Sequence, residues 1–244
     1  MTILNRRQAL ISAGTVPLVA CGAVSAETPQ KAKFVPAPSK DGFSSLSPDE
    51  ALQFLMNGNE AFLAGKDSNP PVGPERRLEL AKGQAPFCAY VTCSDSRVPP
   101  ELLFGRGLGE LFIIRNAGNT IDTVAMGSIE YAVAVLKVPL VVVMGHQSCG
   151  AVDAARKVVT EDARFPGAID DMINPILPAV LGVRDKDGQI NLDDAVKENV
   201  RRTVNMLRKE ADPIMLDPQR SGAMKVVGAY YDLDKGRVDF FDKA

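Results

Sequence analysis

Two short polar clusters hold the residue types best suited to chemistry. Cys93, Asp95 and Arg97 occupy alternate positions directly after an apolar run, and His146 and Cys149 follow a second apolar run. Two thiolates and one imidazole form a donor set that suits zinc, and three protein ligands leave a fourth position open for water or substrate. Cys149 also precedes an expected helix, whose N-terminal dipole favours the thiolate. The pattern predicts a catalytic metal site.

Asp95 and Arg97 are expected to form an ion pair beside that metal. Side chains two residues apart share a face where the chain is extended. Asp95 would then accept a hydrogen bond from the reacting water, and Arg97 would hold the carboxylate in position. In a closed state Asp95 would bind the metal itself. Without a metal, the pair would be a surface ion pair of little energetic value.

A purely structural zinc site would need a fourth Cys or His ligand. His146 is the chain's only histidine, and Cys21 and Cys88 are the only remaining cysteines. Cys21 lies in an expected leader, and Cys88 lies within an expected strand, so neither is well placed. A zinc-binding or thiol-redox module without catalysis remains an alternative, and it would have no use for Asp95 and Arg97.

The elements that must position these clusters alternate between strand and helix. Ser47 and Glu50 form a capping box that predicts the first helix. Residues 105–109 (GRGLG) resemble a glycine-rich phosphate loop, but they precede an apolar strand and no helix follows them, so they are expected to be a turn. The alternation predicts an α/β fold with a mostly parallel sheet flanked by helices, in one domain over residues 46–244. Both clusters would lie at the carboxyl ends of strands. The expected strands are 87–91, 111–114, 139–144, 226–231 and 237–241, and the expected helices are 75–82, 124–136, 149–159, 169–183 and 193–210.

Composition excludes several classes of function. The 244 residues include 28 Lys and Arg against 30 Asp and Glu, a net charge of −2, which lacks the basic excess needed to bind nucleic acid. No apolar run after the first thirty residues approaches the about 18 residues that span a bilayer.

The first 26 residues have the charge profile of a twin-arginine signal peptide. Arg6 and Arg7 precede a weakly apolar run, and no acidic residue occurs before Glu27. Cleavage after Ala26 and lipidation of Cys21 at a lipobox both remain open, as does a basic, frayed terminus. Residues 27–45 are expected to be a linker. The protein is therefore expected to be periplasmic or otherwise exported, and a lipid anchor at Cys21 would attach it to a membrane.

The clusters resemble those of the beta class of carbonic anhydrases. The matching segments are residues 93–98 (CSDSRV), 115–119 (RNAGN) and 145–150 (GHQSCG), and the likeness extends from about Ser47 to the strand containing Tyr230 and Tyr231. The resemblance implies reversible hydration of carbon dioxide to bicarbonate and a proton. It implies one Zn²⁺ per subunit, bound by Cys93, His146 and Cys149, with Asp95 and Arg97 as the catalytic dyad.

The same resemblance implies a substrate pocket shared between subunits. Residues 82–86 (KGQAP) look like a segment of the plant-like subgroup, in which Gln84 would hydrogen-bond substrate across a dimer interface. Phe112, Ala117, Tyr131 and Gly150 fall where the family binds its substrate. At least a homodimer is expected.

Regulation and substrate choice are further expectations from the resemblance. The allosteric subgroup builds a second bicarbonate site around a Trp; this chain has no Trp and Tyr90 matches that position, which favours the non-allosteric subgroup. Independently of the resemblance, two thiolates cancel the charge of Zn²⁺, so activity is expected to rise into alkaline pH. A carbon disulfide or carbonyl sulfide hydrolase on the same scaffold is the nearest alternative.

Overall fold

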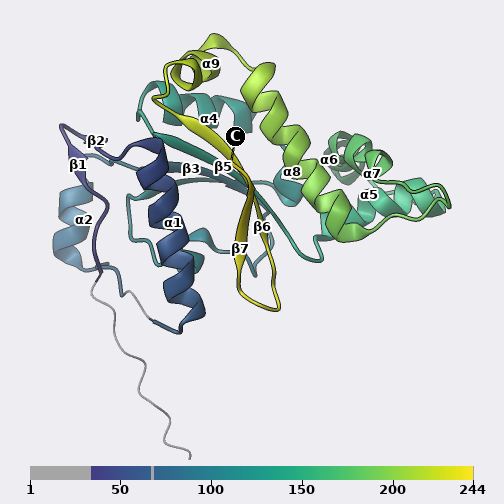
Figure 1. Ribbon diagram of the computed structural model, residues 1–244, viewed down its shortest axis with the longest axis horizontal. Coiled ribbons are helices and arrows are strands. Elements are labelled where there is room, and N and C mark those ends of the chain that lie inside the picture. The colour runs from purple at the N-terminus through teal and green to yellow at the C-terminus, as the bar shows by residue number, and fades with distance from the viewer. Residues whose placement is uncertain (1–33, 67–68, 244) are drawn as a thin grey trace, which may run out of the picture.

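The sheet at the centre of the molecule is mostly parallel, as the sequence predicts. The computed structural model describes residues 34–66 and 69–243. Its main sheet has the strand order β4-β3-β5-β6-β7, and every neighbouring pair is parallel except β6 and β7 (Figure 1). The strands are β3 Cys88–Thr92, β4 Leu111–Arg115, β5 Leu140–His146, β6 Lys225–Tyr231 and β7 Val238–Asp242.

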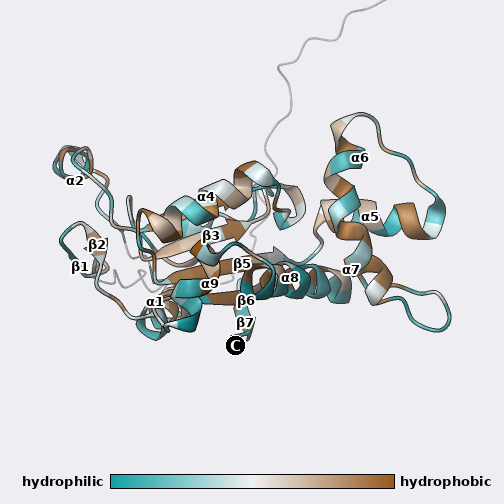
Figure 2. Cartoon of the chain, turned by 90° about the horizontal axis from the view of Figure 1, so that it is seen from above, coloured by the Kyte–Doolittle hydropathy of each residue, from teal (hydrophilic) through white to brown (hydrophobic). Residues whose placement is uncertain are grey.

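Helices connect and cover the strands, which confirms the α/β class. Figure 2 shows the apolar strands between helices on both sides. The α-helices are α1 Pro48–Leu63, α2 Pro74–Leu80, α3 Pro100–Leu103, α4 Thr123–Ala134, α5 Gly150–Glu161, α6 Ala168–Ile173, α7 Leu177–Gly182, α8 Leu192–Lys209 and α9 Pro213–Arg220. Two 3₁₀ helices, η1 Ala117–Asn119 and η2 Asn174–Ile176, and a hairpin of β1 Ser39–Lys40 with β2 Phe43–Ser44 complete the described elements.

Alternate side chains of the central strands enter two separate cores. Cys88 and Tyr90 of β3 belong to the core that includes α1, whereas Ala89 and Val91 belong to the core that includes α4 and α9. Every residue of β5 is buried, as expected for a parallel strand covered on both faces. Packing on both faces fixes β3 and β5 firmly, and therefore fixes the segments that follow them.

Of three local predictions for helices and turns, two are confirmed and one is wrong. The capping box is present, because the Ser47 hydroxyl accepts a bond from the Glu50 amide and the Glu50 side chain accepts one from the Ser47 amide. The single helix expected over residues 169–183 is wrong. The chain forms α6, η2 and α7 there, because Pro175 and Pro178 have no N–H and their rings clash with a continuing helix. Residues 105–109 are a turn, as expected.

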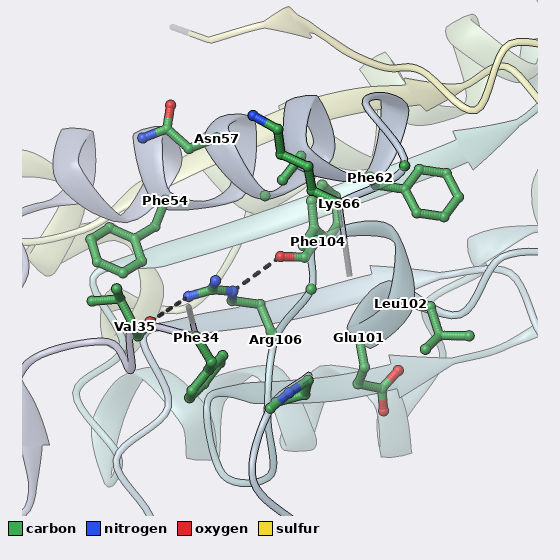
Figure 3. Close-up of a pocket in the computed structure, with 15 residues that line it drawn as sticks. Phe34, Val35, Phe54, Asn57, Phe62, Lys66, Glu101, Leu102, Phe104 and Arg106 are labelled. Carbon is green, nitrogen blue, oxygen red and sulfur yellow. Dashed lines mark hydrogen bonds between the residues drawn. The ribbon is translucent and has the colours of Figure 1, made fainter. Parts of the chain in front are cut away.

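The described part of the expected linker is folded against the domain. Glu110, which is buried, accepts a hydrogen bond from the Ala37 amide at 2.6 Å. The Arg106 guanidinium lies 5.5 Å from the ring centre of Phe34 and 5.6 Å from that of Phe54, beside a cavity of about 590 Å³ between α1 and α3 (Figure 3). In the part of the expected linker that the structure describes, residues 34–45, these contacts hold Phe34 and Ala37 against the domain, and residues 39–44 form the β1–β2 hairpin.

The predicted signal peptide, its cleavage sites and Cys21 lie outside the described residues. Within residues 34–66 and 69–243, no helix is long and apolar enough to cross a membrane.

Candidate metal centre

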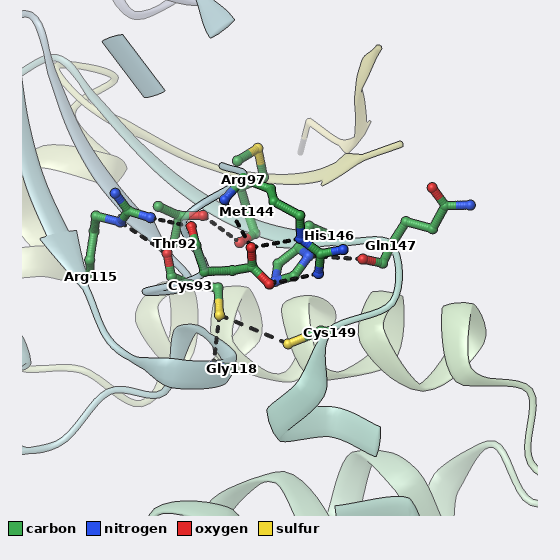
Figure 4. A network of polar contacts seen from close by, with 10 residues as sticks. Thr92, Cys93, Arg97, Arg115, Gly118, Met144, His146, Gln147 and Cys149 are labelled. Carbon is green, nitrogen blue, oxygen red and sulfur yellow. Dashed lines mark hydrogen bonds and ion pairs between the residues drawn. The ribbon is translucent and has the colours of Figure 1, made fainter. Parts of the chain in front are cut away.

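The three expected ligands meet at the carboxyl edge of the sheet. β3 and β5 are neighbours in parallel register, with Thr92 opposite Met144, so Cys93 and His146 emerge at the same edge. Cys149 lies three residues after His146 and is the N-cap residue of α5. The two Sγ atoms are 4.0 Å apart, and the three ligand atoms lie within 4.8 Å of one another (Figure 4).

The ring of His146 has one nitrogen prepared for a metal. Nδ1 lies 2.9 Å from the carbonyl oxygen of Gln147, which is an acceptor, so Nδ1 carries the proton and donates it. Nε2 is therefore unprotonated and faces the two cysteines. It is buried and has no hydrogen-bond partner among the described residues. A buried lone pair without a partner is costly, and a metal ion removes that cost, so these residues fit the expected group.

A hydrogen bond joins the two cysteines, from Cys149 Sγ to Cys93 Sγ. The pKa of Cys93 falls to about 4, because the Cys149 thiol and the amide of Gly118 donate hydrogen bonds to it, against the effect of burial. The pKa of Cys149 rises, because it stands beside that thiolate and is buried. A divalent cation would favour release of the second proton, since thiolates are the metal-binding form.

Asp95 and Arg97 form a two-pronged ion pair next to the ligands. Arg97 Nε donates to Asp95 Oδ1 at 2.9 Å, and Nη2 lies 2.8 Å from Oδ2. These bonds hold the pKa of Asp95 well below its usual range. Asp95 Oδ2 is 3.9 Å from His146 Nε2, so the carboxylate faces the space between the ligands.

The ion pair of Asp95 and Arg97 does not arise from an extended backbone, contrary to the expectation from the sequence. The chain is not extended beyond β3: the Val98 amide donates to the Asp95 carbonyl at 3.2 Å, which closes a turn, and the Arg97 amide donates to Asp95 Oδ1 at 2.9 Å. The turn, rather than a shared strand face, brings the two side chains together.

Arg115 holds the backbone of this turn, a role that the motif alone did not indicate. Its Nε donates to the Cys93 carbonyl at 3.0 Å and its Nη2 to the Asp95 carbonyl at 2.5 Å. Ser94 returns a bond from its hydroxyl to the Arg115 carbonyl at 3.1 Å. An Arg at the last position of the neighbouring parallel strand was the available signal, because that register places it beside the end of β3.

Four of the expected substrate residues form two pairs in the structure. Ala117 begins η1 beside Gly118, which is bonded to Cys93, and Gly150 follows Cys149, so these two lie next to the ligands. Phe112 of β4 and Tyr131 of α4 pack together, with ring centres 6.2 Å apart, at the β4 edge of the sheet.

Gln84 lies far from the ligands of its own chain. It is in the loop before β3, near Gly109 and Glu110, which precede β4. That loop is at the amino edge of the sheet, opposite Cys93. Within a single chain, Gln84 and the candidate metal group therefore lie at opposite edges of the sheet.

Tyr90 and Cys88 of β3 are both buried in the core. Tyr90, the match for the Trp of the allosteric subgroup, is fully buried; its hydroxyl donates to Met144 Sδ at 3.0 Å. Cys88 is also buried within β3, and desolvation raises the pKa of its thiol. Among the described residues, the candidate metal group contains neither of them.

A mostly parallel sheet with a Cys-His-Cys group at its carboxyl edge defines an α/β protein with a candidate metal centre. The family model described as carbonic anhydrase matches residues 88–238. Carbonic anhydrase 2 of Mycobacterium tuberculosis is 40% identical over 194 residues, which cover 80% of this chain and 93% of that relative. The carbonic anhydrase of Mycolicibacterium smegmatis is 40% identical over 193 residues, covering 79% and 93% of the two chains.

Solved structures show the same fold. One of two tetrameric beta-carbonic anhydrases from Sordaria macrospora has a TM-score of 0.63 and 26% identity, and the match covers 79% of this chain and 97% of that one. The Coccomyxa beta-carbonic anhydrase in complex with acetazolamide has a TM-score of 0.57 and 30% identity, with coverage of 67% and 75%. The chain belongs to the beta-class carbonic anhydrases.

Proposed function

We propose that this protein is a zinc enzyme that reversibly hydrates carbon dioxide to bicarbonate and a proton. The observation that carries the proposal is the convergence of Cys93, Cys149 and the unpartnered Nε2 of His146 beside the Asp95–Arg97 pair. Two thiolates and a neutral imidazole suit zinc and leave a position free for the reaction. Zinc, when bound, supplies Lewis-acid activation of water.

Asp95 would act as the hydrogen-bond acceptor for the reacting water. Its carboxylate remains ionised, and Arg97 occupies both oxygens, which keeps Asp95 from turning toward the ligands. The acceptor is thus fixed in position before the substrate arrives, and no reorientation is needed during the reaction. Without Arg97, Asp95 would be free to adopt the closed state, in which it binds the metal.

A second subunit would complete the substrate site. Ala117 and Gly150 line the space next to the ligands, with Phe112 and Tyr131 further along the β4 edge. Gln84 lies at the opposite edge of its own sheet, so its proposed contact with substrate requires another copy of the chain. The Sordaria relative is described as tetrameric, which supports a homodimer or higher homo-oligomer here.

The plant-like, non-allosteric subgroup and export are also proposals. The burial of Tyr90, whose hydroxyl is already bonded to Met144, supports the absence of a second bicarbonate site at that position. Arg6 and Arg7 support twin-arginine export to the periplasm. Cleavage after Ala26 and lipidation of Cys21 remain the two ways in which the leader would be processed.

The test is stopped-flow hydration of carbon dioxide by the zinc-loaded protein lacking residues 1–26. We expect a rate well above that of buffer, rising from about pH 6.5 to about pH 9, because two thiolates neutralise the zinc charge and make its water less acidic than at a three-histidine site. Removal of zinc by a chelator should abolish the rate, and re-addition should restore it. A protein with stoichiometric zinc and no hydration would contradict the proposal.

A further inference from the structure

A chain of hydrogen bonds connects α8 with the metal centre. Asn199 Nδ2 donates to the Gly118 carbonyl at 2.9 Å, across 81 residues of sequence. The Gly118 amide in turn donates to Cys93 Sγ at 3.3 Å. Gly118 is thus held from one side by a helix and presents its N–H to a candidate metal ligand on the other.

Asn199 is an unusual residue for its place in the helix. It is 6% exposed, in the middle of α8, and shares a buried stripe whose other members are apolar. Asn is a poor residue for a helix interior, and a buried amide costs free energy unless it is hydrogen-bonded. The other buried members are Ala195, Val196, Val200, Val204 and Leu207.

The backbone at Gly118 needs to be held in its conformation. Gly118 has a φ of 68°, and a Cβ at that position would lie 2.7 Å from Ile176 Cδ1 and 3.1 Å from Ala151 Cβ. Asn119 follows with a φ of 48°, so two successive residues are left-handed. Such a conformation persists where the surroundings enforce it. The bond from Asn199 to the carbonyl and the bond to Cys93 together fix the orientation of Gly118.

The same turn of α8 also contacts the other ligand segment. A Cβ at Gly145, the residue before His146, would lie 2.5 Å from Val196 Cγ1 and 2.9 Å from Val200 Cγ2. Asn199 lies between these two valines in the sequence. One helical turn therefore packs directly behind the strand that carries His146 and bonds to the loop that contacts Cys93.

We propose that Asn199 is a positioning residue for the Cys93 thiolate. By holding the Gly118 carbonyl, it keeps the Gly118 N–H directed at Sγ, where the bond stabilises negative charge on sulfur and weakens electron donation from that sulfur to the metal. This inference rests on the proposed zinc site. If Asn199 served only to satisfy a buried carbonyl, its replacement would change stability but not the electronic properties of the bound metal.

The test compares cobalt(II) forms of the wild type, Asn199→Asp and Asn205→Asp. Asp keeps the shape of Asn, and in its ionised form it cannot donate to the Gly118 carbonyl. Asn205 is exposed on the same helix and is the matched control. In Asn199→Asp we expect the sulfur-to-cobalt charge-transfer band to move to lower energy, because the sulfur donates more strongly. Metal affinity should fall about 10-fold, because Cys93 is no longer held in position for the metal. The control should match the wild type in both measurements.

A measurement on the wild type covers the case in which Asn199→Asp does not fold. In protein loaded with an NMR-active cadmium isotope, the N–H···S bond should give scalar coupling between cadmium and the Gly118 amide proton; its absence would overturn the inference. A wild type without stoichiometric metal would contradict the proposed function itself. A metal-loaded wild type and a folded Asn199→Asp with the same band and affinity would overturn only the role of Asn199.

Discussion

Asp95 depends on Arg97 for its orientation. Two side-chain bonds, at 2.9 and 2.8 Å, join Arg97 to the two carboxylate oxygens. Arg97→Ala removes both and frees the carboxylate to turn toward the ligands, since Oδ2 is already 3.9 Å from His146 Nε2. We expect carbon dioxide hydration to fall about 10- to 100-fold with zinc content unchanged. Stopped-flow rates and metal analysis on the same preparation would check this.

Asp162 and Arg164 provide the control for that substitution. They have the same spacing, with Arg164 Nη2 3.2 Å from Asp162 Oδ1, but both side chains are more than four-fifths exposed, at 85% and 84%. Arg164→Ala should leave the rate unchanged, because an exposed pair contributes little. A wild-type rate in Arg97→Ala would remove Arg97 from the mechanism.

The sequence predicted the candidate metal group better than the residues that support it. Cys93, His146 and Cys149 could be identified because rare residue types follow apolar runs. Asn199 could not, because its partner is a backbone carbonyl 81 residues away and no side-chain pattern marks such a bond. The contacts of Arg115 are likewise to backbone carbonyls.

At the scale of elements, Arg208 of α8 joins the last two strands to the helix. Its Nη2 donates to the Val226 carbonyl at 2.6 Å, and its Nη1 lies 2.6 Å from Asp242 Oδ1. A lysine ammonium cannot replace this fork of donors. Arg208→Lys should therefore lower the free energy of unfolding by about 1–3 kcal/mol. Urea unfolding of the zinc-loaded protein would measure the change.

Arg220 is a suitable control for the same substitution. It pairs with Asp217 at 3.1 Å, and its side chain is 70% exposed. Arg220→Lys should change the free energy of unfolding by less than about 0.5 kcal/mol. Equal losses in the two variants would mean that the contacts of Arg208 with β6 and β7 add nothing specific.

Strands were easier to predict than breaks and short elements. Five apolar or β-branched runs correspond to β3–β7, because burial in a covered sheet determines their composition. The break at Pro175 and Pro178 was missed because the apolar pattern continues through it. The β1–β2 hairpin carried a usable signal: Asp41 and Gly42 both have positive φ, and Asp-Gly is a common hairpin turn.

At the scale of the whole molecule, Gln84 tests whether subunits share sites. Gln84→Ala leaves the metal ligands intact, whereas Cys93→Ser removes one. If each site takes Gln84 from its partner, a hybrid of the two variants has one complete site. Unfolding and refolding an equal mixture in the presence of zinc should then restore about one quarter of wild-type activity, since half of randomly formed dimers are hybrids.

The matched mixture uses Gln53→Ala with Cys93→Ser. Gln53 is exposed on α1, so Gln53→Ala alone should retain full activity, and its mixture should show about half of wild-type activity, in proportion to its intact ligand sets. For Gln84→Ala, an activity equal to the average of the two separate variants would contradict a shared site.

The pairing of β3 with β5 also sets an order of events during biosynthesis. Cys93 and Cys149 are 56 residues apart in sequence and meet only because these strands are neighbours. Closing so long a loop is slow, and an unfolded chain has no preformed site, so tight metal uptake follows folding. A precursor that crosses a membrane already folded would carry its metal from the compartment of synthesis. In refolding experiments, the onset of tight metal binding would report when β3 and β5 pair.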